Sequence, residues 1–405
     1  MSEAKDNIQH NTQPIIPGQF ADIAPYTDLE FRSKMSELVN EDGFEHAVRY
    51  VMPDVDYPEF IKQLLELKSQ DQFQRQVMGD FLELLAKTTT DGISIDGLDK
   101  CKAGESYTFI TNHRDIVLDA SFLNLCFIRN NMPLTQVAIG NNLLIYEWIS
   151  DLVKLNRSFI VKRDVQRLQA LDAARQLSAY IHYTINTLKE SVWIAQREGR
   201  AKDSNDVTQE SLVKMLSLDG GGSIKENILA VNLMPVSISY EFDPNDYLKA
   251  REFLLKRRDP DFKKSKRDDL FSMETGLLRH KGRIHFRIGN CINEELRKYE
   301  GGEDRAHVVH ETCRLIDRTI HCGYNIFPCN YIAYDEVSGS ARFSDHYTAA
   351  DVERFDEYIN KQLDKVDVDN VTSEEREYMR HMMLSMYANP LRNQLAAMEA
   401  GDMPL

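Results

Sequence analysis

The sequence has few of the features that mark secreted, membrane-spanning or disulfide-stabilised proteins. Its six cysteines include no Cys-x-x-Cys pair, which is more typical of reduced thiols than of a disulfide framework. No apolar run approaches the ~18 residues that would span a bilayer. The first residues are polar and lack the apolar core of a signal peptide. We therefore expect a cytoplasmic protein, with peripheral contact to the inner face of a membrane as a further option.

Positive charge is also in deficit, because the sequence has 49 Lys and Arg residues but 64 Asp and Glu residues, which gives a net charge of −15. This balance argues against nucleic acid as the main partner. Hydrophobic residues make up 42% and charged residues 28% of the 405 positions, as in ordinary soluble proteins of two or three structural units. One basic cluster between residues 256 and 267 is either a solvated loop or a docking surface for anionic lipids or an acidic carrier protein. It consists of Lys256, Arg257, Arg258, Lys263, Lys264, Lys266 and Arg267.

Several common catalytic and cofactor motifs are missing. The run Asp-Gly-Gly-Gly-Ser at 219–223 is not followed by the Gly-Lys-Ser/Thr of a phosphate-binding loop. There is no Gly-x-Ser-x-Gly elbow and no dinucleotide-binding Gly-x-Gly-x-x-Gly. His307, His310 and Cys313 recur at a helical spacing, which favours surface or core positions over a metal site. We predict no metal and no cofactor.

The chain divides into four parts by pattern. Residues 1–27 are a polar lead-in with three prolines, expected to be extended or mobile. Residues 28–90 form a helical domain, 91–335 alternate strands with helices, and 336–405 return to a helical pattern. The fold class is therefore α/β, with a mixed, mostly parallel sheet flanked by helices and helical segments at both ends. Strands are predicted at 92–98, 107–111, 134–139, 158–162, 191–196, 228–240 and 283–289.

One histidine stands where a strand passes into a helix. The predicted strand 107–111 runs into a polar turn that contains His113, and a helix pattern follows Asp119. Such junctions are where α/β folds place active sites. An imidazole also needs a carboxylate to fix its tautomer, and both Asp115 and Asp119 are near enough in sequence. The alternative is that His113 only caps or packs the start of the helix.

Two further strands end in charged residues. Lys162 and Arg163 follow one predicted strand and could hold a phosphate or form a surface basic pair. A second charged stretch follows the strand at 191–196, with a glycine that permits a sharp turn. This density of charge favours a binding role over a plain surface loop. The stretch includes Glu198, Gly199, Arg200 and Lys202.

Pro235 interrupts the last of these patterns. A proline within a strand indicates a bulge or an edge strand. We expect this strand either to line a pocket wall or to be an ordinary edge.

In this order, these stretches resemble the glycerolipid acyltransferase family, the PlsC-like phosphate acyltransferases. That family shows Asn-His and a downstream Asp after a strand, then Phe-Ile-x-x-Arg, then Glu-Gly-x-Arg, then a Val-Pro-Val strand. The resemblance extends over residues 92–292, about half of the chain. The counterparts here are Asn112-His113 with Asp119, residues 159–163, Glu198-Gly199-Arg200 and Met234-Pro235-Val236.

Two departures leave alternatives open. Five residues separate His113 from Asp119, where the family has four. Either the turn contains an inserted residue or Asp115 has become the partner, and we favour Asp119 because the residues after it look like the family's helix start. The Glu-Gly-x-Arg block is one residue short, so that Arg200 or Lys202 could be the counterpart of the family's arginine.

The resemblance implies a PlsC-like fold and acyl transfer. The donor would be acyl-CoA or acyl-acyl-carrier protein, and the acceptor a hydroxyl of glycerol 3-phosphate or of a lysophospholipid such as lysophosphatidate. His113 would act as general base and Asp119, or Asp115, would orient it. Arg163, Arg200 and Lys202 would bind the acceptor phosphate and Glu198 its other hydroxyl. The remaining predicted substrate-binding residues are Asn112, Arg114, Lys162, Gly199 and Pro235.

Two alternatives compete with this reading of the sequence. One is an acyltransferase whose acceptor has no phosphate, such as an amino-acid lipid. The other is a non-catalytic protein that binds lipid or a carrier protein.

Overall fold

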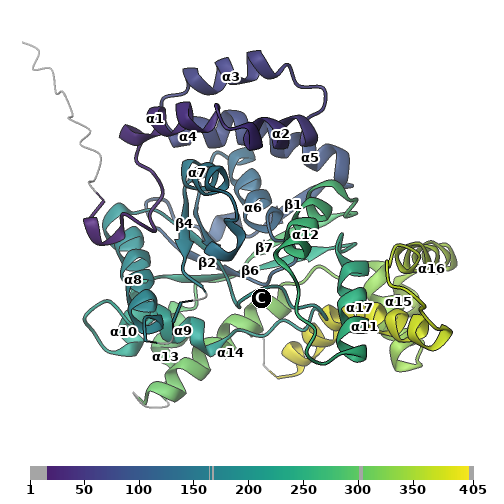
Figure 1. Cartoon of the computed structure of the whole chain (residues 1–405). Helices are drawn as coiled ribbons and strands as arrows, with labels where there is room; N and C mark the ends of the chain where they lie inside the picture. The colour runs from purple at the N-terminus through teal and green to yellow at the C-terminus, as the bar shows by residue number, and fades with distance from the viewer. Residues whose placement is uncertain (1–15, 164, 167, 301–303, 401–405) are drawn as a thin grey trace, which may run out of the picture.

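A seven-stranded sheet lies at the centre of the protein (Figure 1), in a computed structural model that describes residues 16–163, 165–166, 168–300 and 304–400. The strand order is β1-β7-β6-β2-β5-β3-β4. Strands β6, β2, β5, β3 and β4 are parallel, whereas β7 runs antiparallel to β6 and pairs in parallel with β1. This confirms the predicted mixed, mostly parallel sheet. The strands are β1 (Ile93–Asp96), β2 (Thr108–Thr111), β3 (Gln136–Gly140), β4 (Ser158–Val161), β5 (Val192–Ala195), β6 (Leu233–Tyr240) and β7 (Ile284–Ile288).

Helices cover both faces of the sheet, which explains the near-continuous apolar runs of the central strands. In β2, Phe109 packs on the side of α6 (Leu118–Arg129), whereas Ile110 packs into the core on the other face. All eight positions of β6 are buried. The helices of the second face are α8 (Ala170–Tyr183), α9 (Glu210–Leu216), α10 (Ile224–Ala230), α13 (Asn293–Lys298) and α14 (Arg305–Cys322).

The N-terminal helices form a layer of their own, drawn in purple and blue at the top of Figure 1. The apolar faces of its first three helices share a core that includes Phe31, Leu64 and Phe73 and also Leu155 of α7 (Glu147–Leu155), whereas its last helix packs on α6. The layer is therefore joined to the sheet domain through α7 and α6. It consists of α1 (Asp28–Leu38), α2 (Asp42–Val51), α3 (Tyr57–Glu66), α4 (Gln70–Gln72) and α5 (Gly79–Thr89).

Residues 16–27, the described part of the predicted lead-in, are not extended or mobile as expected. Phe20 and Ile23 are buried, with the ring of Phe20 5.3 Å from that of Tyr180. The carbonyl of Ile23 accepts a hydrogen bond of 2.8 Å from the N–H of Ile160, so this segment covers the edge strand β4. The segment differs from the expectation because it also contains apolar side chains, and burial of these side chains stabilises one fixed conformation. Residues 1–15 lie outside the described part of the chain.

The C-terminal helices pack directly against the α/β domain. The predicted boundary at 335/336 falls within α15, which lies against α17. Asp246 of α11 accepts hydrogen bonds from the hydroxyls of Tyr358 (2.7 Å) and Tyr387 (2.8 Å), which come from α16 and α17. Met383 and Met386 are buried in this core. The C-terminal helices are α15 (Pro328–Ser338), α16 (Ala349–Leu363) and α17 (Ser373–Glu399). Two further helices, α11 (Asp246–Arg258) and α12 (Lys266–Leu278), precede β7 in the α/β region.

The strand predicted at 228–240 is shorter and more central than expected. Residues up to Ala230 belong to α10, and β6 begins only at Leu233. Pro235 lies between β2 and β7 and not at an edge. Its carbonyl accepts from the N–H of Gly289, just beyond the end of β7. A proline is tolerated there because the missing N–H faces the end of β7, where regular antiparallel pairing has not yet begun.

Candidate active site

The carboxyl ends of the parallel strands open onto one cavity of about 2020 Å³. His113 follows β2, Arg163 follows β4 and Glu198 follows β5, and all three line this cavity. Parallel strands place their carboxyl ends at the same edge of a sheet, which is where α/β folds bind ligands. The fold thus brings together residues that are far apart in sequence.

His113 is held by Asp119. The ring atom Nδ1 lies 2.8 Å from Oδ2 of Asp119, and the carboxylate is fully buried. The same oxygen accepts the main-chain N–H groups of Arg114 (2.6 Å) and Asp115 (3.1 Å). A hydrogen donated by Nδ1 to the carboxylate leaves Nε2 free to accept a proton. The edge of the ring packs against Trp193, with ring centroids 5.9 Å apart.

Asp115 has a different place in the turn. Its Oδ1 accepts the N–H groups of Val117 (2.9 Å) and Leu118 (2.8 Å), so it caps the start of α6. Burial, followed by the nearby charge of Asp119, raises the pKa of its carboxyl group. Of the two carboxylates that the sequence left open, Asp119 is the one in contact with the His113 ring.

Asn112 and Arg114, both predicted to bind substrate, have internal partners instead. The Asn112 amide donates to the carbonyl of Ile238 (2.9 Å) and accepts its N–H (2.8 Å), which extends the pairing of β2 with β6. Arg114 donates from two nitrogens to the carboxylate of Asp206, at 3.0 and 2.5 Å. Both side chains are buried, and neither lines the cavity. Their positions correct the prediction, because partners far away in sequence satisfy their polar groups.

The predicted phosphate-binding residues do reach the cavity. Lys162, Arg163, Arg200 and Lys202 line it together with Glu198. The Nε of Arg163 lies 3.8 Å from Oε1 of Glu198. Lys162 is less available, because it pairs with Asp22 and donates to Gln176 at 2.8 Å.

Two predicted residues act through the backbone. Gly199 has a φ of +67°, a conformation that favours glycine and turns the chain between the two charged neighbours. Pro235 is buried in the sheet and does not line the cavity, contrary to the expectation of a pocket wall.

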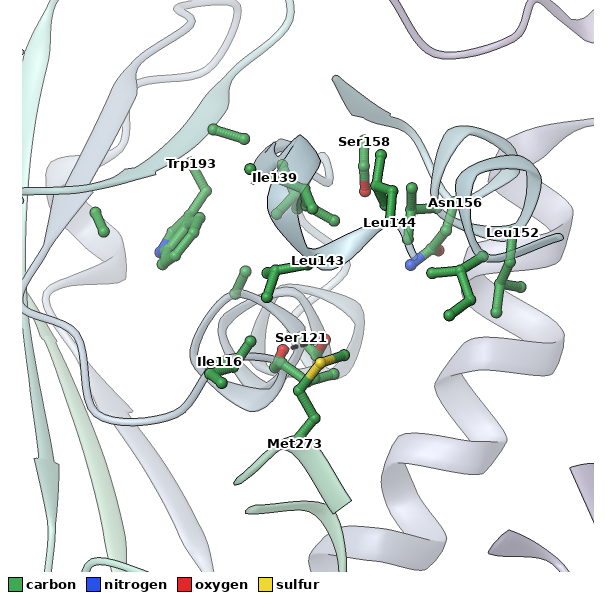
Figure 2. Close-up of a pocket in the computed structure, with 18 of the residues that line it drawn as sticks. Ile116, Ser121, Ile139, Leu143, Leu144, Leu152, Asn156, Ser158, Trp193 and Met273 are labelled. Carbon is green, nitrogen blue, oxygen red and sulfur yellow. Dashed lines mark hydrogen bonds between the residues drawn. The ribbon is translucent and has the colours of Figure 1, made fainter. Parts of the chain in front are cut away.

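The apolar wall of the cavity was not predicted. Side chains of the N-terminal layer, including Phe44, Phe60 and Phe81, line it together with residues of α6 and α7. Figure 2 shows Ile116, Leu143, Leu144 and Met273 around this part, with Trp193 beside them. No sequence signal separates such a wall from a packed core, since both need the same apolar stripe on a helix.

Some residues of the basic cluster 256–267 form ion pairs with a neighbouring helix, and others line the cavity. Arg257 and Arg258 pair with Glu374 (2.6 Å) and Glu375 (2.7 Å) of α17. Lys256 and Lys264 line the cavity instead. The side chain of Lys266 lies outside the described residues. The cluster is thus partly structural and partly directed at the candidate site.

Within the described ranges, no group of three or more His, Cys, Asp or Glu side chains is arranged to hold a metal ion. No helix among these residues combines the length and the apolar character needed to cross a membrane.

Comparisons with known proteins show distant structural likeness only. No family model matches the sequence, and no curated protein matches it. Among solved structures, the 1-acyl-sn-glycerophosphate (LPA) acyltransferase PlsC from Thermotoga maritima is similar over 71% of this chain and 92% of its own, with a TM-score of 0.35 and 8% identity. At that TM-score the likeness assigns neither a family nor an activity.

Proposed function

We propose that the protein transfers a fatty acyl group from a thioester to a hydroxyl of glycerol 3-phosphate or of a lysophospholipid. The supporting observation is the His113–Asp119 pair at one cavity that has both an apolar wall and a cationic region. An apolar wall suits an acyl chain, and cations suit a phosphate. The donor would be acyl-CoA or acyl-acyl-carrier protein.

The chemistry requires a base but no side-chain nucleophile. Nε2 of His113 would take the proton of the acceptor hydroxyl while the hydroxyl oxygen attacks the thioester carbonyl. A carbon–oxygen bond forms, the carbon–sulfur bond breaks, and the imidazolium returns the proton to the departing thiolate. Asp119, buried against Nδ1, would stabilise the imidazolium between these two transfers.

The cations at the strand ends would orient the acceptor. Arg163 and Arg200 line the cavity and offer planar groups that bind phosphate through two nitrogens. Glu198 is exposed beside Arg163 and would accept a hydrogen bond from the second hydroxyl of the acceptor.

Peripheral contact with the inner face of a membrane belongs to the same proposal, because the acyl products are lipids. Lys263, which does not line the cavity, and Arg267 would contribute by attraction to anionic headgroups. Binding to anionic vesicles should weaken with rising salt, and more in the native protein than in a Lys263→Gln/Arg267→Gln variant. Equal salt dependence would remove these two residues from the proposal.

The test is an assay of the full chain with palmitoyl-CoA or palmitoyl-acyl-carrier protein. Glycerol 3-phosphate, lysophosphatidate and a lyso-amino lipid serve as separate acceptors, with thiol release and acylated product both measured. His113→Ala should lower turnover by roughly 10²–10⁴, the usual contribution of a general base. His307→Ala, an exposed histidine outside the cavity, is the matched control. Lipid binding without turnover with any acceptor would reject the proposal in favour of a lipid-binding protein.

A further inference from the structure

A buried carboxylate on α11 gathers three lysines at the cavity. Glu252 has only 3% of its surface exposed. It forms ion pairs with Lys202, with Lys256 at 3.0 Å and with Lys264 at 3.0 Å. Lys202 comes from the loop after β5, Lys256 from the last turn of α11, and Lys264 from the segment between α11 and α12. Three separate parts of the chain thus direct an ammonium group to one point.

The three lysines remain open to the cavity, and the carboxylate does not. Their side chains are 31%, 50% and 24% exposed, against 4% for Glu252. All three line the cavity, whereas Glu252 does not. The carboxylate therefore lies behind the lysines and holds their ammonium groups at the wall of the cavity.

Charge around this point does not balance. Three ammonium groups share one carboxylate, and Arg200 adds a further positive charge at the same wall. Burial, followed by Lys264, Lys256, Arg200 and Lys249, lowers the pKa of Lys202 to about 7. The carboxylates of Asp269 and Asp268 on α12 act on Lys264 and offset only part of the excess. An anion with two charges would restore the balance.

The cations next to Lys256 in sequence each have a carboxylate partner of their own. Arg257 and Arg258 follow Lys256 directly, and each has its own carboxylate on α17. Of these three consecutive cations, only Lys256 lines the cavity, and it shares its carboxylate with two other lysines. A merely solvated basic face would not need a buried carboxylate to hold its lysines.

We propose that Lys202, Lys256 and Lys264, positioned by Glu252, form a subsite for a phosphate dianion, in addition to the phosphate site expected at Arg163. The role of that phosphate rests on the proposed function, since both the CoA of an acyl donor and the acceptor carry phosphate groups. Binding of the anion itself does not depend on acyl transfer.

The experiment is titration calorimetry on the full chain with free CoA, with glycerol 3-phosphate and with inorganic pyrophosphate. Lys256→Gln/Lys264→Gln removes two cavity charges, and Arg251→Gln/Arg257→Gln removes two charges of α11 that do not line the cavity. The cavity variant should lose at least tenfold in affinity for one of the phosphate ligands, while the matched variant stays within about twofold of the native protein. Loss confined to CoA identifies the donor phosphate, and loss confined to glycerol 3-phosphate identifies the acceptor phosphate.

A conservative variant separates binding from folding. Lys256→Arg/Lys264→Arg keeps both charges and should retain most of the affinity, with an unchanged thermal unfolding midpoint in all three variants. Equal losses in the cavity and matched variants, or unchanged affinity in both, would overturn the subsite. Anion binding by a protein without acyl transfer would reject the proposed function and leave the subsite standing.

Discussion

A single oxygen of Asp119 holds both the ring of His113 and the backbone of the turn that carries it. Oδ2 lies 2.8 Å from Nδ1 of His113 and also accepts the N–H groups of the next two residues. The orientation of the imidazole and the path of the chain after β2 therefore depend on the same buried carboxylate. A change at Asp119 therefore affects both the imidazole of His113 and the main chain of the turn.

Asp119→Asn should come close to the loss of turnover caused by His113→Ala. An amide can still accept the main-chain N–H groups, but it no longer stabilises an imidazolium and can favour the wrong tautomer. We expect a decrease in kcat of roughly 10²–10⁴. Because the two residues act together, the double variant should be little worse than His113→Ala.

Asp115→Asn is the matched control for that loss. Its oxygen only caps α6, and an asparagine caps nearly as well. Turnover should change little. A severe effect of Asp115→Asn together with a mild effect of Asp119→Asn would show that the contact seen at His113 is not the one used in catalysis.

Arg163→Ala should raise the apparent KM for the phosphate-bearing acceptor by roughly ten- to a hundredfold, the usual cost of losing a charge-assisted hydrogen bond. The KM for the thioester should change much less. Arg175→Ala, an exposed arginine outside the cavity, is the comparison variant. Steady-state kinetics with each substrate varied in turn decides the matter, and a shift in donor KM alone would contradict the assignment.

Affinity for a phosphate ligand should fall as pH rises above about 7. Lys202 has a pKa of about 7 in the free protein, and a bound anion would raise it. The attraction is therefore complete only about one pH unit below this pKa, and affinity falls by up to about tenfold per pH unit above pH 7, because binding must take up a proton. Lys202→Arg stays charged over this range and should lose the decline. Calorimetry from pH 6 to 9 on both proteins measures it, and identical profiles would exclude Lys202 as the titrating group.

The buried pair of Arg114 and Asp206 should matter for stability. Asp206→Ala leaves a buried guanidinium without its carboxylate and should lower the free energy of unfolding by about 3–5 kcal/mol. Asp172→Ala, which affects an exposed pair at 4.0 Å, should cost less than about 1 kcal/mol. Urea denaturation monitored by circular dichroism compares them. A similar small change in both variants would mean that Arg114 is not held in place by this pair.

The sheet was predictable because its strands are covered on both faces and read as apolar runs. The exception is instructive. Residues 228–230 are as apolar as a strand, but they belong to α10, whose start is marked by a capping box of Ser223 and Glu226. Such a box predicts that the residues directly after Ser223 are helical and that the strand begins further along the chain.

Part of the candidate site was predictable because its residues lie within single loops. His113 and Asp119 are separated by one turn, and the charged residues after β5 form one stretch. Asn112 and Arg114 were assigned wrongly for the opposite reason. Their partners, Ile238 and Asp206, lie 126 and 92 residues away in sequence, so that nothing local shows the polar groups to be satisfied.

The antiparallel strand β7 also affects the order in which the chain can fold during synthesis. β6 is buried on one side by β2, which precedes it, but its other side is covered only when β7 has been made, after α11 and α12. Until then the nascent chain presents an unpaired edge that carries Val236 and Ile238. β1 is synthesised much earlier and also lacks its pairing partner until β7 has been made. A pause in synthesis after β6 has emerged from the ribosome and before β7 has been made would therefore leave an aggregation-prone intermediate with this edge exposed.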